Sequence, residues 1–326
     1  KIGFNDFSGG IAASGGTLSN LNALIAARNN AGLGSDPNSV LLVSEDAHSS
    51  FVKCIRVMGL DTRNLVRIKT DNQGRMDIND LRNSLDKCSI ENKKIFAIVA
   101  TLGTTVRGAI DPIKEISEIC KQRNIWLHID GSIGGIFAIT SIPIEGLNNI
   151  NQANSITINP QKIIGITKTS SLLLVSNMST LENTFNTGLP YISSKENIIN
   201  RGEIGIQGSR PAEVIKLWLG LRFLGLKGIE NILKSSIKRK DFFVKNISKN
   251  KFDIYSGPLH IVSFLPNKLE PKDSDAWTQT KVNELINNNF MLSRPKFKGK
   301  YFLRVVMGNY NTKDSDIEEL LRLLNA

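Results

Sequence analysis

Two residues that can do chemistry, an aspartate and a lysine, follow short apolar segments in the middle of the chain. Asp130 comes directly after segment 125–129, and Lys162 ends an Asn-Pro-Gln-Lys stretch at 159–162. A lysine amine of lowered pKa can hold an aldehyde as a Schiff base, and a carboxylate can keep a pyridine nitrogen protonated. A Ser-Gly-Gly-Thr turn at 14–17 precedes an expected helix, whose free backbone N–H groups can bind a phosphate. Together these residues predict a site for pyridoxal 5′-phosphate.

Taken singly, each of these residues also has an ordinary structural explanation. Lys162 could be a solvated loop lysine, Asp130 a turn or helix-cap aspartate, and segment 14–17 a simple helix start. The turn is not a Walker loop, because it lacks the Gly-Lys-Ser/Thr ending. Glycines follow Asp130 at 131, 134 and 135, and they suit a place where backbone approaches a ligand closely. The combination therefore favours the cofactor site.

Two further side chains could contribute to such a site. His48 follows the apolar segment 40–43, and an imidazole there could stack on a flat ring. Thr105 follows the apolar segment 95–100 and could offer a hydroxyl to the phosphate. His128 alternates within an apolar segment, so we expect it to be structural, and no pattern supports a role for His260.

The apolar pattern predicts an α/β fold, because short apolar runs alternate with segments of helical spacing. The expected strands are 40–43, 66–68, 95–100, 125–129, 155–158 and 171–175. The expected helices are 17–31, 49–58, 77–85, with Asp77 as N-cap, and 112–123, with Pro112 at the first position. Such alternation indicates a mostly parallel sheet, with functional loops at the carboxyl ends of its strands. Asp130, Thr105 and Lys162 all fall on such loops.

The second half of the chain has a different pattern. Residues 178–210 are expected to form a long, partly mobile loop, and 211–248 a helix interrupted near Gly225 and Gly228. Beyond it we expect strands near 254 and over 261–264, 290–293 and 301–307, with helices over 275–287 and 315–324. We therefore predict two domains: a large cofactor-binding α/β domain over 1–224 and a small α+β domain over 225–326.

Composition excludes several classes of protein. No apolar run approaches the ~20 residues of a membrane helix, and no signal segment opens the chain. The net charge of +11 comes from scattered lysines, which favours a solvated basic surface over nucleic-acid binding. Three histidines make a multi-histidine metal site improbable. Three distant cysteines favour a reducing cytoplasmic compartment over a disulfide framework; they are Cys54, Cys88 and Cys120.

In these motifs the chain resembles the pyridoxal-phosphate-dependent group II amino-acid decarboxylases. The ordered set covers nearly the whole chain and is highly specific. It consists of 13–17 with Asn20 and 26–28, 47–50, 100–105 with Gly108 and Asp111, 126–130, 159–162, 208–210 before 217–218, and Leu303 and Arg304 near Asn309.

The resemblance implies a fold-type I, aminotransferase-like architecture and a homodimer with sites at the subunit interface. It implies that Lys162 holds the cofactor covalently, that Asp130 pairs with the pyridine nitrogen and that His48 stacks on the ring. Residues near the phosphate would be Gly16, Thr17, Thr105 and Asn159. Tyr191, in the long loop, is similar in placement to the family's proton donor.

The chain also departs from the family pattern. Gln161 stands where histidine usually precedes the lysine; glutamine can donate a hydrogen bond but carries no charge, which predicts a weaker hold on the phosphate. Leu18 and Ser132 replace a glutamate and an alanine that occur in members of the family. The chain begins almost directly in the glycine-rich motif, so we expect that the family's N-terminal helical segment is missing.

The predicted activity is decarboxylation of an L-amino acid to its amine and CO2. Three alternatives remain open: a pyridoxal-phosphate enzyme of another reaction type, such as a lyase or aminotransferase, a catalytically weakened homologue, and a non-catalytic binding protein with the same fold. The expected partners are a small amino-acid substrate and a second copy of the chain, with neither nucleic acid nor membrane. No residue can be assigned to the substrate side chain from the sequence.

Overall fold

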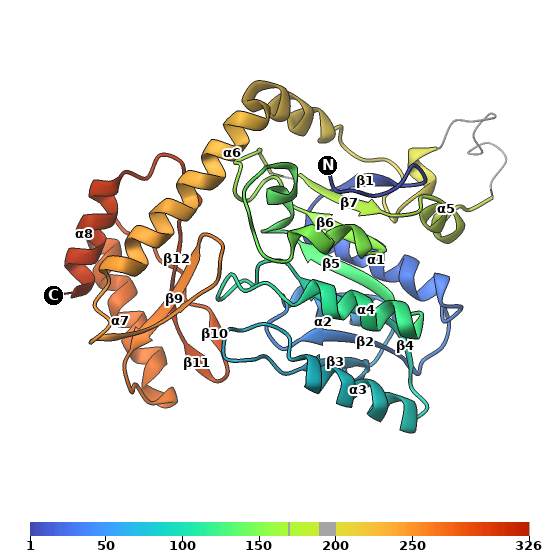
Figure 1. The fold of residues 1–326 in the computed structure, drawn as a ribbon, viewed down its shortest axis with the longest axis horizontal. Coiled ribbons are helices and arrows are strands. Elements are labelled where there is room, and N and C mark those ends of the chain that lie inside the picture. The colour runs from blue at the N-terminus through green and yellow to red at the C-terminus, as the bar shows by residue number, and fades with distance from the viewer. Residues whose placement is uncertain (169, 189–199, 326) are drawn as a thin grey trace.

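A seven-stranded sheet forms the larger part of the molecule in a computed structural model, which describes residues 1–168, 170–188 and 200–325. Its order is β1-β7-β6-β5-β4-β2-β3, and β2 to β6 run parallel, while β7 is antiparallel to both β6 and β1 (Figure 1). The expected mostly parallel sheet is confirmed. The strands are β1 Gly9–Ala13, β2 Ser39–Ser44, β3 Leu65–Ile68, β4 Lys94–Thr101, β5 Trp126–Gly131, β6 Ser155–Ile158 and β7 Ser171–Val175.

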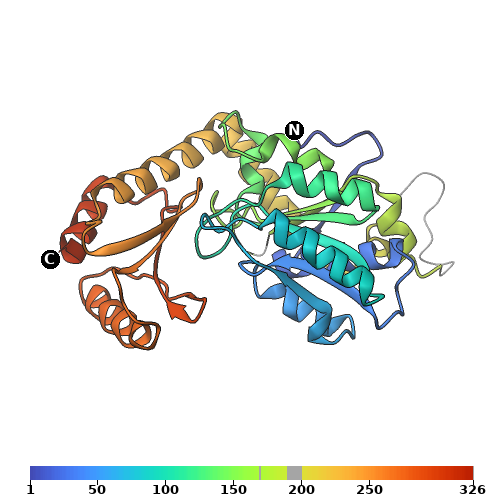
Figure 2. The ribbon, with the colours of Figure 1, turned by 60° about the horizontal axis from the view of Figure 1, so that its bottom comes forward.

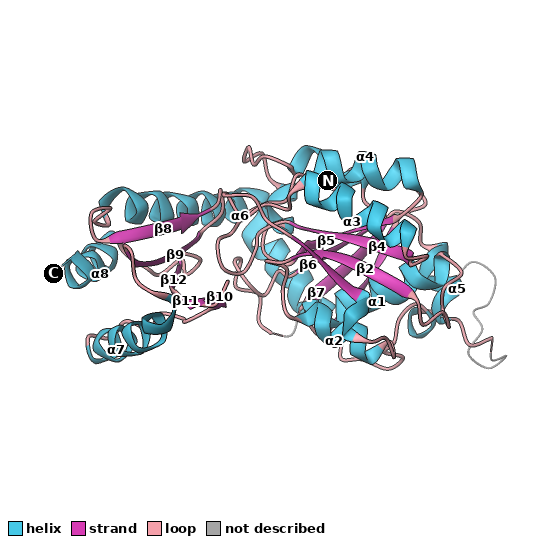
Figure 3. Ribbon diagram, turned by 90° about the horizontal axis from the view of Figure 1, so that it is seen from below, coloured by secondary structure: helices cyan, strands magenta, loops and turns pink. Residues whose placement is uncertain are grey.

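Helices cover both faces of this sheet. α1 (Gly16–Asn30) and α2 (Ser50–Val57) lie on one face, and α3 (Ile78–Ile90) and α4 (Ile113–Arg123) on the other (Figure 3). Successive side chains of a strand point to opposite faces. In β2, Leu41 and Val43 therefore pack with α1 and α2, whereas Val40 and Leu42 join the core under α3 and α4. Burial on both faces explains why the strands are continuous apolar runs in the sequence.

Local signals set several helix ends as expected. Asp77 caps α3, because its carboxylate accepts hydrogen bonds from the backbone N–H groups of Asn79 and Asp80. α4 begins at Ile113, one residue later than predicted, so Pro112 stands immediately before the helix rather than at its first position. α4 ends at Arg123, and the capping residue Asn124 adopts the left-handed conformation at φ 51°.

A long helix, α6 (Val214–Asn246), joins the large sheet to a smaller one (Figure 2). Leu217, Ile229 and Leu233 of α6 belong to the core of the large sheet, and Phe243 belongs to the small core. The helix is broken at Gly225, where φ is 60° and ψ is 174°, which suits only glycine; Gly228 continues the helix. One of the two predicted interruptions is thus confirmed.

The smaller sheet has the order β12-β9-β8 and packs against helices. Its core is aromatic, with the rings of Phe243 and Phe252 lying 5.7 Å and 5.4 Å from that of Phe264. The elements are β8 Phe252–Ser256, β9 Ile261–Pro266, α7 Ser274–Asn287, the hairpin β10 Lys296–Phe297 and β11 Lys300–Tyr301, β12 Leu303–Val306 and α8 Asp314–Asn325. Short 3-10 turns lie at Thr62–Asn64, Gly135–Ile139, Leu147–Gln152, Arg201–Glu203 and Pro271–Asp273.

Two local expectations were wrong, and one strand was missed. Residues 290–293 form no strand, and Ser293 makes only an isolated bridge to Arg304. Within the expected loop 178–210, Ser179–Phe185 form a helix, α5, which buries Leu181 in a small core beside α1 and β7. The Gly-Gly-Ile-Ala-Ala stretch of β1 gave no strand signal, because glycine and alanine are poor strand formers and its pairing with β7 is non-local.

Candidate active site

Eight of the nine predicted site residues line one pocket of about 430 Å³ at the carboxyl ends of the central strands. The loops after β2, β4, β5 and β6 and the first turn of α1 build it. The eight residues are Gly16, Thr17, His48, Thr105, Asp130, Asn159, Gln161 and Lys162. The ninth, Tyr191, lies outside the residues that the structure describes. The pocket matches the rule that open α/β sheets bind ligands beyond the carboxyl ends of their strands.

The start of α1 has the shape of an anion-binding turn. Gly15 precedes the helix at φ 149°, and no side chain of the described residues caps this end. A Cβ atom at Gly16 would lie 2.7 Å from Asn159 Nδ2 and 2.8 Å from Ser132 Oγ, so only glycine fits there. Backbone N–H groups at an uncapped helix start favour a phosphate.

Asp130 is held in one orientation at the end of β5. Its Oδ1 accepts a hydrogen bond from the Ser132 backbone N–H at 3.1 Å, and its Oδ2 accepts one from Asn20 Nδ2 at 3.1 Å. The residue is 5% exposed. Both donors are neutral, so they orient the carboxylate without cancelling its charge, and it stays available to a cationic ring nitrogen.

Lys162 follows β6 through a turn closed by its own N–H, which donates to the Asn159 carbonyl at 3.1 Å. Its side chain is exposed to the pocket, yet surrounding protein lowers the pKa of the ammonium by desolvation; Asp130 opposes this effect and Arg304 adds to it. A lowered pKa increases the share of neutral amine, which is the form that attacks an aldehyde.

His48 lies in the same pocket in a neutral state. Its Nδ1 accepts a hydrogen bond from the Ser50 backbone N–H at 3.1 Å, which places the ring proton on Nε2. Desolvation lowers the pKa of the imidazole, Asp130 opposes this, and Lys162 and Lys53 reinforce it. A neutral, flat ring suits stacking on an aromatic ligand.

Several polar groups of the pocket are prepared for a ligand. Thr101 Oγ1 and Asn159 Oδ1 are buried and have no hydrogen-bond partner among the described residues. The Gln161 side-chain oxygen accepts from the Ser170 N–H at 2.6 Å, which leaves its NH₂ group as a donor. An acid for the ring nitrogen, an amine for the aldehyde and a helix start for the phosphate lie in one cavity. These residues fit pyridoxal phosphate.

Sequence reasoning assigned no role to Asn20, Ser132 or Thr101, although all three line the pocket. Asn20 sits four residues after Gly16, so helical spacing could have placed both on the same face of α1. Arg304 was also given no role; it reaches across from the small sheet, and its Nη1 donates to the Thr105 carbonyl at 2.6 Å.

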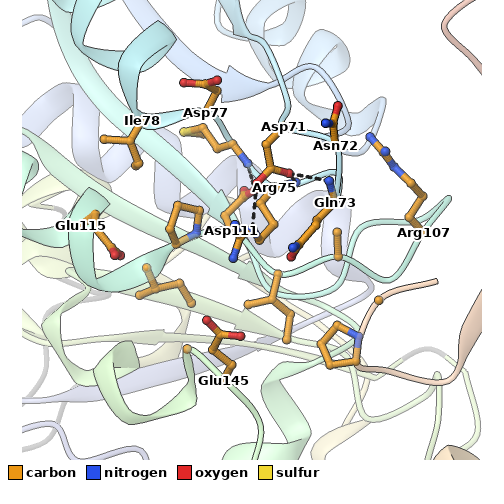
Figure 4. A pocket seen from close by; sticks show the side chains of 18 of the residues that line it. Asp71, Asn72, Gln73, Arg75, Asp77, Ile78, Arg107, Asp111, Glu115 and Glu145 are labelled. Carbon is orange, nitrogen blue, oxygen red and sulfur yellow. Dashed lines mark hydrogen bonds and ion pairs between the residues drawn. The ribbon is translucent and has the colours of Figure 1, made fainter. Parts of the chain in front are cut away.

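A second, larger pocket of about 860 Å³ lies beside the turn at 71–77, and Figure 4 shows its side chains. Its buried acid, Asp111, already accepts hydrogen bonds from the backbone N–H groups of Met76 and Thr101, both at 2.7 Å. Asp71 is likewise paired with Arg75. These carboxylates hold the turn against β4, so the smaller pocket is the better candidate.

A family model described as the pyridoxal-dependent decarboxylase conserved domain matches residues 2–264. The chain belongs to the pyridoxal-dependent decarboxylase family. Its cofactor is therefore pyridoxal phosphate, and the family's reaction is the decarboxylation of an amino acid, which makes it a carboxy-lyase. The predicted family, reaction class and cofactor are confirmed.

Two relatives show the extent of the match. An aromatic-L-amino-acid decarboxylase of Bacillus atrophaeus is 30% identical, and the alignment covers 100% of this chain and 70% of the relative. The acidic amino acid decarboxylase GADL1 of Xenopus tropicalis is 31% identical over 74% of this chain. The chain spans about half of that second relative, 49% of its length.

Solved structures agree on the fold. Mouse CSAD in its apo form has a TM-score of 0.88 at 25% identity, covering 99% of this chain and 72% of the mouse protein. Oryza sativa TDC with PLP and tryptamine has a TM-score of 0.90 at 19% identity, covering 98% of this chain and 69% of the rice protein. The predicted fold-type I architecture is confirmed.

No helix in the described ranges is long and apolar enough to cross a membrane. No group of three or more histidine, cysteine, aspartate or glutamate side chains there could hold a metal ion.

Proposed function

We propose that this chain removes the α-carboxylate of an L-amino acid, giving the corresponding amine and CO2, at the pocket between β5, β6 and the start of α1. The observation that carries the proposal is the convergence of Lys162, Asp130 and the uncapped Gly15–Gly16 turn in one cavity. When bound, the cofactor supplies an electron sink for the electron pair that CO2 leaves behind.

Lys162 and Asp130 have complementary tasks in this proposal. Lys162, whose lowered pKa favours the neutral amine, would hold the aldehyde of the cofactor covalently. Asp130, oriented by Asn20 and Ser132, holds a proton on the ring nitrogen. His48 would offer its neutral, flat imidazole to the ring of the cofactor.

The phosphate is assigned to the residues around the first turn of α1. Gly16 and Thr17 offer backbone N–H groups, and the side chains of Thr105, Asn159 and Gln161 add hydrogen-bonding groups. Because Gln161 is neutral, phosphate binding depends on hydrogen bonds and the helix dipole there rather than on a histidine charge. We retain Tyr191 as the proposed proton donor to the substrate Cα on the sequence resemblance alone.

We also propose a homodimer and the division into domains 1–224 and 225–326. The N-terminal half of α6 exposes a set of large apolar side chains that a second copy could cover; these are Val214, Ile215, Trp218, Leu219, Phe223 and Leu226. The break at Gly225 supports the proposed domain boundary. Three buried free thiols are consistent with a cytoplasmic location.

The test is a screen of L-amino acids for CO2 release with added pyridoxal phosphate, on the wild type and on Lys162→Ala. Wild type is expected to release CO2 and one amine, while Lys162→Ala loses the visible absorption of the covalently held cofactor and the activity. Lys121→Ala, which removes an exposed lysine of α4, is the matched control. A keto acid in place of CO2 and amine would refute decarboxylation, and unchanged absorption in Lys162→Ala would refute the role of the lysine.

A further inference from the structure

A line of buried polar side chains connects Asp130 to the interior of the sheet. Trp126 Nε1 donates to Ser155 Oγ at 2.8 Å, and Ser155 Oγ lies 2.8 Å from His128 Nδ1. His128 Nε2 lies 3.1 Å from Asn20 Oδ1, and Asn20 Nδ2 donates to Asp130 Oδ2 at 3.1 Å. Exposure is 6% for Trp126, 1% for Asn20 and zero for His128 and Ser155.

We propose that Asn20, His128 and Ser155 are positioning residues, which form a one-directional hydrogen-bond chain that holds the Asp130 carboxylate aimed at the ring nitrogen of the cofactor. The inference rests on the proposed function, because it concerns the same pocket. It assigns a role to His128 beyond that of a packed strand residue.

The Asp130 carboxylate accepts from the Asn20 NH₂ group, which turns Asn20 Oδ1 toward His128 Nε2, and the far end of the hydrogen-bond chain is compatible with these roles. The Trp126 indole N–H can only donate, so it occupies a lone pair of Ser155 Oγ. The hydroxyl hydrogen of Ser155 can then point at His128 Nδ1, which makes Nδ1 the acceptor and leaves the ring proton on Nε2. That proton meets Asn20 Oδ1, and the amide NH₂ group faces Asp130.

The reverse orientation of the Asn20 amide would require a different protonation state of Asp130. If the Asn20 amide were flipped, its oxygen would face Asp130 Oδ2, and two acceptors would meet unless Asp130 carried a proton. The flipped amide would also bring its NH₂ group to His128 Nε2, which would have to be unprotonated. The orientation of Asn20 is therefore linked to the ionisation of Asp130.

The hydrogen-bonded residues Asn20, His128 and Ser155 supply no positive charge that would compete with the ring nitrogen for Asp130. Burial lowers the pKa of His128 to about 4, with Asp130 opposing this effect, so the imidazole is neutral near pH 7. The other ionisable groups with electrostatic influence from Asp130 are His48, Cys54 and Lys162. Apart from His48, whose pKa is lowered, Lys162 is the one of these groups that forms a cation when protonated, and it is the residue assigned to the aldehyde.

Asn20 also links the two ends of the site mechanically. It lies one turn after Gly16 on α1, whose first residues form the proposed phosphate turn. The same helix therefore presents donors to the phosphate with its start and a donor to Asp130 with its second turn. A shift of α1 would disturb both contacts together.

The test uses pyridoxal phosphate labelled with ¹⁵N in the ring, bound to wild type, Asn20→Leu and His128→Leu. Without the amide donor, the carboxylate of Asp130 is no longer held toward the ring nitrogen, so its ion pair with the protonated nitrogen weakens. The ¹⁵N resonance is then expected to move from the protonated toward the unprotonated position, and kcat to fall by roughly tenfold, the equivalent of one buried hydrogen bond to a charged group. His128→Gln, which can retain an N–H donor toward Asn20, is expected to restore part of the shift.

Ser19→Ala is the matched control. Ser19 is also buried on α1 and pairs with Ser171 Oγ at 2.8 Å, but it takes no part in the hydrogen-bond chain from Ser155 to Asp130. It is expected to leave the ¹⁵N resonance unchanged. If Asn20→Leu does not fold, Ser155→Ala removes the hydroxyl beside His128 Nδ1 and is expected to shift the resonance in the same sense.

Two results would overturn the proposal: an unchanged ¹⁵N resonance in folded Asn20→Leu or Ser155→Ala, or an equal shift in Ser19→Ala. The readout needs only cofactor binding. A wild type that shows the protonated resonance but releases no CO2 from any amino acid would therefore refute the decarboxylase proposal and leave this one intact.

Discussion

The sharpest prediction concerns a single methyl group at the start of α1. In Gly16→Ala the new Cβ would lie 2.7 Å from Asn159 Nδ2 and 2.8 Å from Ser132 Oγ, whereas ordinary contacts begin at 3.4 Å. The two side chains must therefore retreat by roughly 0.6–0.7 Å, and overpacking of this kind costs about 1–3 kcal/mol. Both side chains line the pocket, so the methyl group disturbs the place where the phosphate is expected.

The loss should appear mainly in cofactor binding rather than in folding. The pocket is open, so Asn159 and Ser132 can move into it in the free protein, but not when a phosphate occupies that space. A penalty of about 1.4–2.8 kcal/mol on the bound state corresponds to a roughly 10- to 100-fold rise in Kd. The assay is a titration of apoprotein with pyridoxal phosphate, followed by visible absorption, beside urea unfolding of the apoprotein.

Gly228→Ala is the control, because Gly228 lies within helical α6 and an added Cβ meets Leu224 Cβ at an ordinary 3.4 Å. It should leave Kd unchanged and stabilise the apoprotein slightly, since alanine favours helix over glycine by up to about 1 kcal/mol. Wild-type cofactor affinity in folded Gly16→Ala would show that the phosphate does not bind at this turn.

Three further predictions test charged groups that are buried or desolvated in the fold. Burial raises the pKa of Asp111 to about 7, against the backbone N–H groups of Thr101 and Met76, so the folded state binds more protons than the unfolded state between pH 4 and 7. The unfolding free energy of wild type should fall with rising pH over that range relative to Asp111→Asn; parallel pH profiles would contradict this. Asp46→Ala should destabilise the protein by about 3–5 kcal/mol in urea unfolding, because it leaves Arg107 without its 2.6 Å buried ion pair; Arg63→Ala, on an exposed pair, should leave the free energy of unfolding nearly unchanged. Finally, desolvation lowers the pKa of Lys162, so cofactor capture should accelerate with pH to a midpoint below 10.5; a midpoint at or above that value in stopped-flow absorption would refute the lowered pKa.

Short-range patterns in the sequence predicted the large sheet well but missed its edges. β4 and β5 are continuous apolar runs because both of their faces are buried, and such runs are visible without any knowledge of the fold. β1 and α5 are both stabilised by non-local contacts. β1 pairs with β7, and α5 buries essentially one residue, Leu181, in a small core to which β1 and β7 also contribute. Neither carries a local period, so sequence reasoning left one out and treated the other as loop.

The sequence by itself determined the chemistry of the site. Asp130, Lys162 and the glycine turn are identified by residue type and by their position after apolar segments, and the parallel sheet necessarily brings such positions to one edge. Only the tertiary structure decided how those groups are held. The bonds from Ser155 to His128, from His128 to Asn20 and from Asn20 to Asp130 join residues far apart in the chain. No local pattern encodes them, because the direction of each hydrogen bond depends on the partner that packing places beside it.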